Sequence, residues 1–187
     1  MKGQHLLVLF SLLLTIVIIG CDLFQTREPQ LPTQNSSTRE PPASAEIVLR
    51  NFRYAIIEYN VDNYMRCFAD TSLRQFVFIP SNYYGVFNQW NVESERQYFL
   101  NLGAPPSNTP PTLTVTVIDS SLSSDTARYS INYRLFFPHH RTDVAQTVQG
   151  NMQLYFLRDQ QALWYIHRWE DSRTTTDSTW SYLKANI

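Results

Sequence analysis

Glycine and cysteine are scarce in this sequence, at 5 and 2 of 187 residues. Five scattered glycines form no Gly-rich loop of the kind that holds a nucleotide phosphate, and no Gly-x-Ser-x-Gly motif is present. Two cysteines cannot build the disulfide framework that supports many small secreted domains. Basic and acidic residues nearly cancel, at a formal net charge of −1, so composition gives no electrostatic reason to expect a nucleic-acid partner.

Long hydrophobic runs are missing as well. The longest nearly apolar stretch, residues 6–19 (LLVLFSLLLTIVII), is shorter than the roughly 20 helical residues that a bilayer core requires. Its length, after a short basic start, is typical of the apolar region of a secretion signal. Over the whole chain, 43% hydrophobic, 14% aromatic and 17% charged residues indicate a globular protein rather than a disordered one.

The apolar stretch ends in the sequence Ile18-Ile19-Gly20-Cys21, which resembles the lipobox of bacterial lipoproteins. The resemblance implies that residues 1–20 are a signal peptide, that cleavage follows Gly20, and that Cys21 carries diacylglycerol on its sulfur. Acyl chains of this kind anchor a protein stably to a membrane. We therefore expect an extracytoplasmic lipoprotein of the bacterial cell envelope, with the choice between inner and outer membrane left open. The alternative is an uncleaved signal anchor.

Residues 21–43 predict a flexible tether. Four prolines interrupt this segment, Ser, Thr, Gln and Asn fill much of the rest, and no apolar period of 2 or 3.6 is present. Such a segment buries too little apolar surface to offset the entropy lost on ordering. We expect the folded domain to occupy residues 44–187.

The first half of that domain predicts three helices. Ser44 is a suitable N-cap for a helix beginning at Ala45, whose apolar residues recur at helical spacing. Capping residues at 60–63 precede a second short helix, predicted to carry Met65 and Phe68. A third helix begins after Asn91 and is closed by Gly103.

The second half predicts strand after strand. A short strand at residues 75–79 lies among the helices, and alternating patterns then mark strands near 113–117, 125–135, 148–156 and 164–169. Helices followed by a run of antiparallel strands indicate an α+β fold, with three N-terminal helices packed on a curved, mainly antiparallel sheet.

This order of elements resembles the nuclear transport factor 2-like (SnoaL-like) superfamily, an α+β cone. The likeness covers roughly residues 45–185 and rests on segments 59–64 (YNVDNY), 164–171 (WYIHRWED) and 179–184 (TWSYLK). It implies a pocket between helices and sheet, and dimers formed through the outer sheet face. The superfamily contains isomerases, dehydratases and cyclases as well as non-catalytic binding modules, so the fold alone does not set function.

Candidates for chemistry are few. Acid–base catalysis needs a titratable group aimed into a dry cavity, and we expect the apolar face of the sheet to carry no carboxylate and no histidine. Glu58, Asp62 and Asp70 are the remaining candidates, although helix capping also explains the two aspartates. His139 and His140 are adjacent in a predicted solvated turn and point in opposite directions, so we expect no metal site and no cofactor.

Cys67 lies among apolar neighbours and is interpreted as a small buried hydrophobic residue.

Alternate strand positions predict an outer sheet face rich in Arg, amide and aromatic side chains. Such residues suit a contact surface for a second copy or another envelope protein. A merely solvated face and a carbohydrate-stacking face are the alternatives. The predicted face consists of Arg128, Asn132, Arg134, Asn151, Gln153, Tyr155, Tyr165, His167 and Trp169.

From these patterns we expect a membrane-anchored lipoprotein whose domain is a non-catalytic binding or assembly module. Its ligand would be either a partner protein at the outer sheet face or a small apolar molecule in the pocket. The alternative is an acid–base isomerase or hydrolase that uses a carboxylate in the cone pocket. A carboxylate facing an open cavity would favour the enzyme, and a filled interior would favour binding or assembly.

Overall fold

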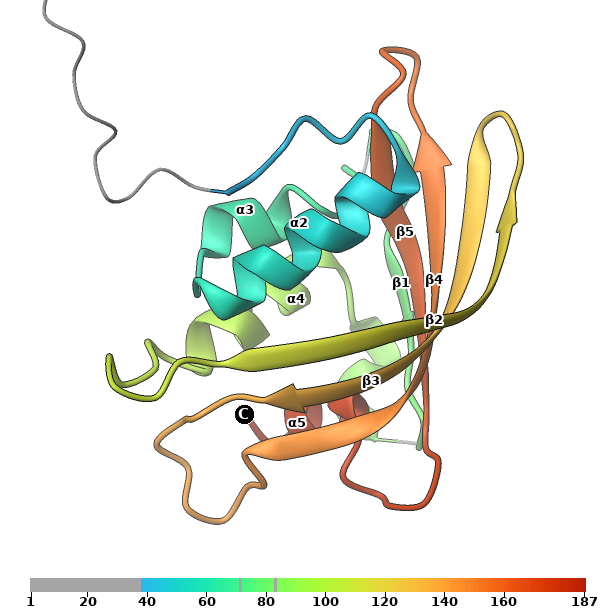
Figure 1. Ribbon diagram of the computed structural model, residues 1–187. Helices are drawn as coiled ribbons and strands as arrows, with labels where there is room; N and C mark the ends of the chain where they lie inside the picture. Colours follow the sequence, from blue (N-terminus) through green and yellow to red (C-terminus); the bar gives the residue numbers. More distant parts are fainter. Residues whose placement is uncertain (1–37, 71, 83) are drawn as a thin grey trace, which may run out of the picture. The chain divides into compact units, whose positions relative to one another are not determined.

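The computed structural model describes residues 38–187 with the exception of positions 71 and 83. Residues 38–187 form one compact unit (Figure 1). The predicted signal peptide, the proposed lipidation site at Cys21 and the tether as far as residue 37 lie outside the described residues. No helix in the described part of the chain has both the length and the hydropathy needed to cross a membrane.

Helices α2 (Ala45–Ile57), α3 (Val61–Met65) and α4 (Val92–Asn101) confirm the three predicted helices. The N-caps are as predicted, since the side chains of Ser44, Asn60 and Asn91 accept hydrogen bonds from backbone amides in the first turns. Helix α4 is followed, after its C-cap Leu102, by Gly103 at φ 73°, a conformation that glycine adopts without strain.

Helix α3 is shorter than predicted, because it ends at Met65 and does not include Phe68. After the helix the chain turns extended and joins the sheet, where the carbonyl of Cys67 accepts the amide of Ile166 at 2.8 Å. Phe68 forms an isolated parallel bridge with the same Ile166. A 3₁₀ helix, η2 (Gly85–Gln89), and a C-terminal helix, α5 (Trp180–Asn186) capped by Thr179, complete the helical part.

Five strands form one sheet in the order β1-β5-β4-β3-β2 (Figure 1). The four long strands pair antiparallel as predicted, and the short strand β1 joins the edge of β5 in parallel. The strands are β1 (Val77–Ile79), β2 (Thr112–Leu122), β3 (Thr126–Phe136), β4 (Thr147–Arg158) and β5 (Trp164–Ser172).

Two irregularities break the strict alternation of the strands. In β2 the register shifts between Val117 and Asp119. In β5 the residues that oppose Tyr155 and Phe156 are Arg168 and Ile166, so His167 is an extra residue in the strand. Such a β-bulge reverses the side to which every later side chain points.

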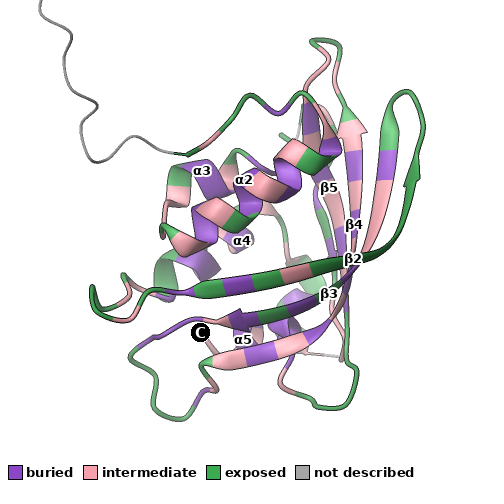
Figure 2. Cartoon of the chain, viewed as in Figure 1, coloured by how far each residue is buried: buried purple, intermediate pink, exposed green. Residues whose placement is uncertain are grey.

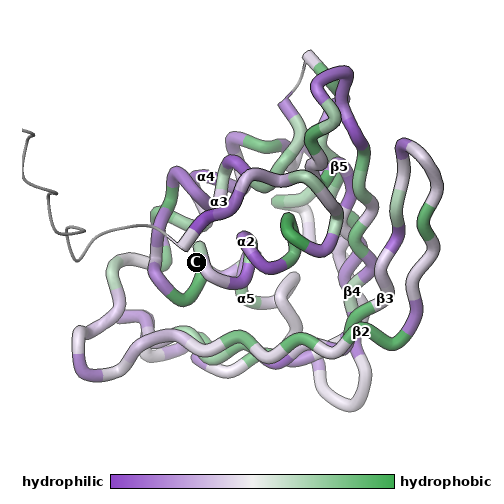
Figure 3. The backbone as a smooth tube through the Cα atoms, turned by 45° about the horizontal axis from the view of Figure 1, so that its top comes forward, coloured by the Kyte–Doolittle hydropathy of each residue, from purple (hydrophilic) through white to green (hydrophobic). Residues whose placement is uncertain are grey.

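Helices cover one face of the curved sheet, and the core lies between the two layers (Figure 1). Buried and more exposed residues alternate along β3 and β4, and Figure 2 shows this pattern as purple bands between pink and green ones. Figure 3 shows the corresponding alternation of hydropathy along β2. The α+β fold class predicted from the sequence is therefore correct.

The segment before α2 packs on the domain rather than leaving it directly. The carbonyl of Pro42 accepts the amide of Trp164 at 2.8 Å. Glu40 exchanges two hydrogen bonds through its backbone with the amide side chain of Asn51, at 2.7 and 2.9 Å. Residues 38–43, which fall within the predicted tether, are thus attached to the domain in this structure.

Candidate functional site

The space between helices and sheet, where the cone would hold a ligand, is filled by aromatic side chains. Phe52 of α2 lies 5.5 Å from Trp169 of β5 and 5.8 Å from Trp180 of α5, measured between ring centroids. Trp169 and Trp180 meet edge to face at 4.7 Å. All three side chains are at most 1% exposed. A second group continues this packing, with Tyr64 stacked on Phe99 at 4.1 Å.

A fully buried ion pair lies within this aromatic interior. The ammonium of Lys184, on α5, lies 2.7 Å from a carboxylate oxygen of Glu95, on α4, and both side chains are 0% exposed. Glu95 also accepts hydrogen bonds from the Tyr64 hydroxyl at 2.6 Å and from the Trp90 indole at 2.8 Å. Its two oxygens therefore have three donors, which is the condition for keeping a carboxylate in the interior.

Aromatic faces enclose the ammonium of Lys184. Its Nζ lies 3.6 Å from the ring centroid of Trp169 and 3.8 Å from that of Phe78, in cation–π geometry. Burial lowers the pKa of Lys184 to about 8, against the opposing effect of Glu95. The Lys184 side chain is 0% exposed, and every neighbour named is a packed side chain of this chain.

A second interior carboxylate, Asp171, also accepts hydrogen bonds on both of its oxygens. One oxygen accepts the Tyr133 hydroxyl at 2.7 Å, and the other accepts the backbone amide of Ser181 at 2.7 Å and its hydroxyl. The Tyr133 oxygen in turn accepts the backbone amide of Trp180 at 2.7 Å. Asp171 thus joins strand β5 to β3 and to the first turn of α5, where a negative charge is favourable.

Gly150 of β4 leaves the space that this network needs. A Cβ at this position would lie 2.6 Å from the carbonyl oxygen of Ser172 and 2.9 Å from the Tyr133 hydroxyl oxygen. The backbone of β4 can approach β3 and β5 here only without a side chain.

The expectation that the inner sheet face carries no carboxylate is wrong, because Asp171 lies on it, 4% exposed. The bulge at His167 turns Trp169 and Asp171 inward, whereas strict alternation places Trp169 outside. Glu95 was missed because it lies in the first turn of a helix, where exposure is the usual interpretation. Glu95 precedes Tyr98 and Phe99 by three and four residues, and this spacing places it on the same, buried side of α4. That spacing was the sequence signal for its burial.

The candidate acids lie on the surface, not in the interior. Asp62 and Asp70 are both exposed and line one open cleft of about 670 Å³, together with three arginines. Glu58 is exposed, accepts a hydrogen bond from the Thr38 hydroxyl, and is not among the lining residues of that cleft. The structure thus brings two of the three candidates together, at a solvated site that lacks the dry surroundings acid–base catalysis requires.

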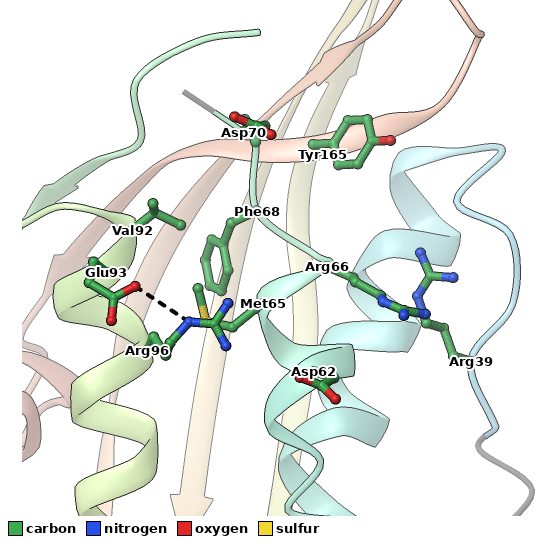
Figure 4. A pocket seen from close by; sticks show the side chains of 11 residues that line it. Arg39, Asp62, Met65, Arg66, Phe68, Asp70, Val92, Glu93, Arg96 and Tyr165 are labelled. Atoms are coloured by element: carbon green, nitrogen blue, oxygen red, sulfur yellow. Dashed lines mark ion pairs between the residues drawn. The ribbon is translucent and has the colours of Figure 1, made fainter. Parts of the chain in front are cut away.

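We call this surface feature the arginine cleft, and Figure 4 shows it from close by. It is formed by the segment before α2, by α3 and the residues after it, by α4 and by the start of β5. Its lining residues are Arg39, Asp62, Met65, Arg66, Phe68, Ala69, Asp70, Val92, Glu93, Arg96 and Tyr165.

The outer sheet face carries most of the residues predicted for it. These side chains are half-buried or exposed, and the set comprises Arg128, Asn132, Arg134, Asn151, Gln153, Tyr155 and His167. Trp169 does not belong to it, because it is 0% exposed in the core. Tyr165 instead lines the arginine cleft.

Three further residues of this face were not predicted from the sequence. Val77 and Ile79 of β1 point away from the core, at 38% and 40% exposure, because Phe78 between them points inward. Arg168, which the bulge turns outward, lies beside Val77, forms an ion pair with Glu170 and stacks over the Tyr155 ring at 5.4 Å. We define the outer sheet face as these residues together with the seven named above.

The histidine pair is not the solvated turn that was predicted. His139 is buried, at 7% exposure, and the preceding Pro138 is buried too, while His140 is exposed. No group of three or more His, Cys, Asp or Glu side chains suited to a metal ion occurs among the residues the structure describes. Cys67 is buried as predicted, and burial raises the pKa of its thiol to about 12.

Comparisons with known proteins bear on the fold. No family model matches the chain, and no curated protein matches it. Among solved structures, a ketosteroid isomerase-like protein from Erwinia carotovora atroseptica is 11% identical, with a TM-score of 0.52 over 72% of this chain and 97% of that one. An NTF2-like protein of unknown function from Pseudomonas putida is 10% identical, with a TM-score of 0.51 over 71% and 85%. At these identities the likeness shows the fold alone, and that fold is the nuclear transport factor 2-like α+β cone.

Proposed function

We propose that this protein is a lipid-anchored, extracytoplasmic lipoprotein whose cone domain is a non-catalytic assembly module. Its contact surface is the outer sheet face, and its partner is a second copy of the chain. The observation that carries the proposal is the filled interior, where aromatic rings of both layers pack within 4.7–5.8 Å of one another. A cone without an interior ligand site must act through its surface.

The acid–base alternative needs a carboxylate that faces a cavity. Glu95 and Asp171 are the interior carboxylates of the described chain, and each is held by donors from three other residues or groups. A base in this condition has no oxygen available to take a substrate proton. The surface candidates Asp62 and Asp70 have the opposite difficulty, since they are solvated.

The outer sheet face has the composition of a contact surface. Val77 and Ile79 form an exposed apolar centre on the edge of the sheet, and Tyr155 adds an aromatic side chain. Arg168 and Glu170 place both signs of charge beside them. A two-fold dimer pairs one patch with its own copy, and a patch that carries both signs is complementary to itself under that rotation.

Sedimentation equilibrium of the chain beginning at residue 38 tests the assembly. We expect a dimer for the wild type and a monomer for Ile79→Glu, which places two carboxylates at the centre of the dimer contact. Leu100→Glu is the matched control, because Leu100 is similarly exposed (43%) on α4, on the helical side. It should remain dimeric. A monomeric wild type, or equal dissociation of both variants, would exclude this face as the contact.

The anchor has a separate test, since it rests on the resemblance of residues 18–21 to a lipobox. Palmitate labelling in a bacterial host should mark the wild type and bring it to the membrane fraction. Cys21→Ser should lose both the label and the membrane association, whereas Cys67→Ser should keep them. Mass spectrometry that finds an intact Met1 and an unmodified Cys21 would contradict the proposal.

A further inference from the structure

The arginine cleft brings together arginines from three separate parts of the chain, alongside the carboxylates of Asp62, Asp70 and Glu93. Arg39 precedes α2, Arg66 is the C-cap of α3, and Arg96 lies on α4. Figure 4 shows Arg39 and Arg66 at one end of the cleft and Arg96 near its middle. Three guanidinium groups on one concave surface are the arrangement that binds carboxylate or phosphate.

Two of the three carboxylates in the cleft, Glu93 and Asp70, already accept hydrogen bonds. Glu93 lies 3.4 Å from Arg96 and accepts the Gln97 amide at 3.0 Å. Asp70 accepts the backbone amide of Ser72 at 3.0 Å. The side chain of Arg66, in contrast, is exposed and forms no hydrogen bond or ion pair with the residues that the structure describes. The ion pair of Arg96 is exposed and contributes little, so an incoming anion can compete for this arginine.

Apolar side chains lie between the arginines. Met65, Phe68 and Val92 form this part of the lining, and Tyr165 borders it from the sheet (Figure 4). The volume of about 670 Å³ lies within the range of small-molecule sites. We propose that the arginine cleft binds a small organic oxyanion, a carboxylate or phosphate monoester on a compact apolar body. This proposal is independent of the outer sheet face.

Calorimetric titration of the full chain in neutral detergent, at low salt, tests the site with phenyl phosphate. We expect saturable binding at least tenfold tighter than that of inorganic phosphate, because only the organic ester reaches both the arginines and the apolar lining. Benzylamine, of opposite charge, should give no saturable heat. Equal affinities for the two phosphates, or binding of benzylamine, would overturn the proposal.

Two variants of cleft residues should change the affinity for phenyl phosphate in opposite directions. Arg66→Gln should weaken phenyl phosphate at least tenfold, whereas Asp62→Asn should tighten it severalfold by removing a negative charge from the cleft. Arg141→Gln, at an exposed arginine outside the cleft, should change affinity less than twofold. No saturable heat with the wild type, or losses of equal size in Arg66→Gln and Arg141→Gln, would show that the cleft is not the site.

Discussion

Lys184 is the only lysine between residues 38 and 187, and it is fully buried against Glu95 and two aromatic faces. Taking both charges out of water is costly, and their mutual attraction offsets this cost only while both are present. The pair is therefore a structural feature that joins α4 to α5 across the aromatic interior. It is also a sensitive probe of whether that interior is as closed as the structure indicates.

Removing one partner of this pair should destabilise the domain strongly. We expect Lys184→Met to lower the free energy of unfolding by about 3–5 kcal/mol, because it leaves the Glu95 carboxylate buried without its counter-charge. Lys184→Met combined with Glu95→Gln should recover part of that loss. Urea unfolding of the wild type and both variants measures the difference. Losses below about 1 kcal/mol, the range of an exposed ion pair, would contradict complete burial.

The thiol of Cys67 predicts a pH dependence. Its pKa is about 12 in the folded protein, raised by burial from a reference value of 9.0, so the native state keeps a proton that the unfolded state loses above pH 9. The contribution of this group to stability is fully present below pH 9 and is lost as pH rises toward 12, by at most about 1.4 kcal/mol per pH unit.

The change in stability between pH 8 and pH 10 should therefore be smaller in Cys67→Ala than in the wild type. Urea unfolding of both proteins at the two pH values measures this, because the other groups cancel in the comparison. The native thiol should also resist a disulfide reagent at pH 8 until the protein unfolds. A wild-type thiol that reacts rapidly in the native state would contradict its burial.

At the scale of elements, the β-bulge in β5 decides which residues belong to the site. The sequence predicted the helices, their caps and the four antiparallel strands, because apolar periods and capping residues are local signals. It could not predict the extra residue at His167, since pairing register depends on β4. One inserted residue moved Trp169 from the predicted surface to the core and brought Asp171 inside.

Long-range contacts explain the other differences. Glu95 and Lys184 are 89 positions apart, and the sequence contains no signal that pairs them. The parallel pairing of β1 with β5 likewise joins distant segments, so the outward Val77 and Ile79 could not be assigned to the contact face. In contrast, the arginine cleft contains Asp62 and Asp70, which were identified from the sequence for acid–base chemistry that their exposed positions do not support.

Gly150 offers a prediction at the same scale. Gly150→Ala would force a Cβ to within 2.6 Å of the Ser172 carbonyl and press on the Tyr133 hydroxyl that holds Asp171. We expect a loss of about 1–3 kcal/mol in the free energy of unfolding, as for other overpacked sites. Gly85→Ala is the matched control, because no atom lies within 4 Å of its added Cβ. Urea unfolding should show a clearly larger loss for Gly150→Ala than for Gly85→Ala. Equal losses would show that a side chain at position 150 does not crowd its neighbours.

For the whole molecule, a closed interior moves every proposed activity to the surface. The core extends continuously from α2 and α4 through the aromatic rings to the inner face of the sheet. We assign two surface features, the outer sheet face to a second copy and the arginine cleft to an oxyanion. Both include residues of β5, but no residue belongs to both, so a variant at one is not expected to affect binding at the other.

Methyl NMR of the chain beginning at residue 38 tests the closed interior most directly. Ile56, Met152, Leu154 and Ile166 are at most 1% exposed and face the space between the layers, so their methyl groups report on any interior ligand. Titration with 2-naphthol and cyclohexanone at millimolar concentrations should leave the methyl signals of these four residues unchanged. A saturable shift at any of them would show an accessible cavity in the cone and would contradict a module that acts only through its surface.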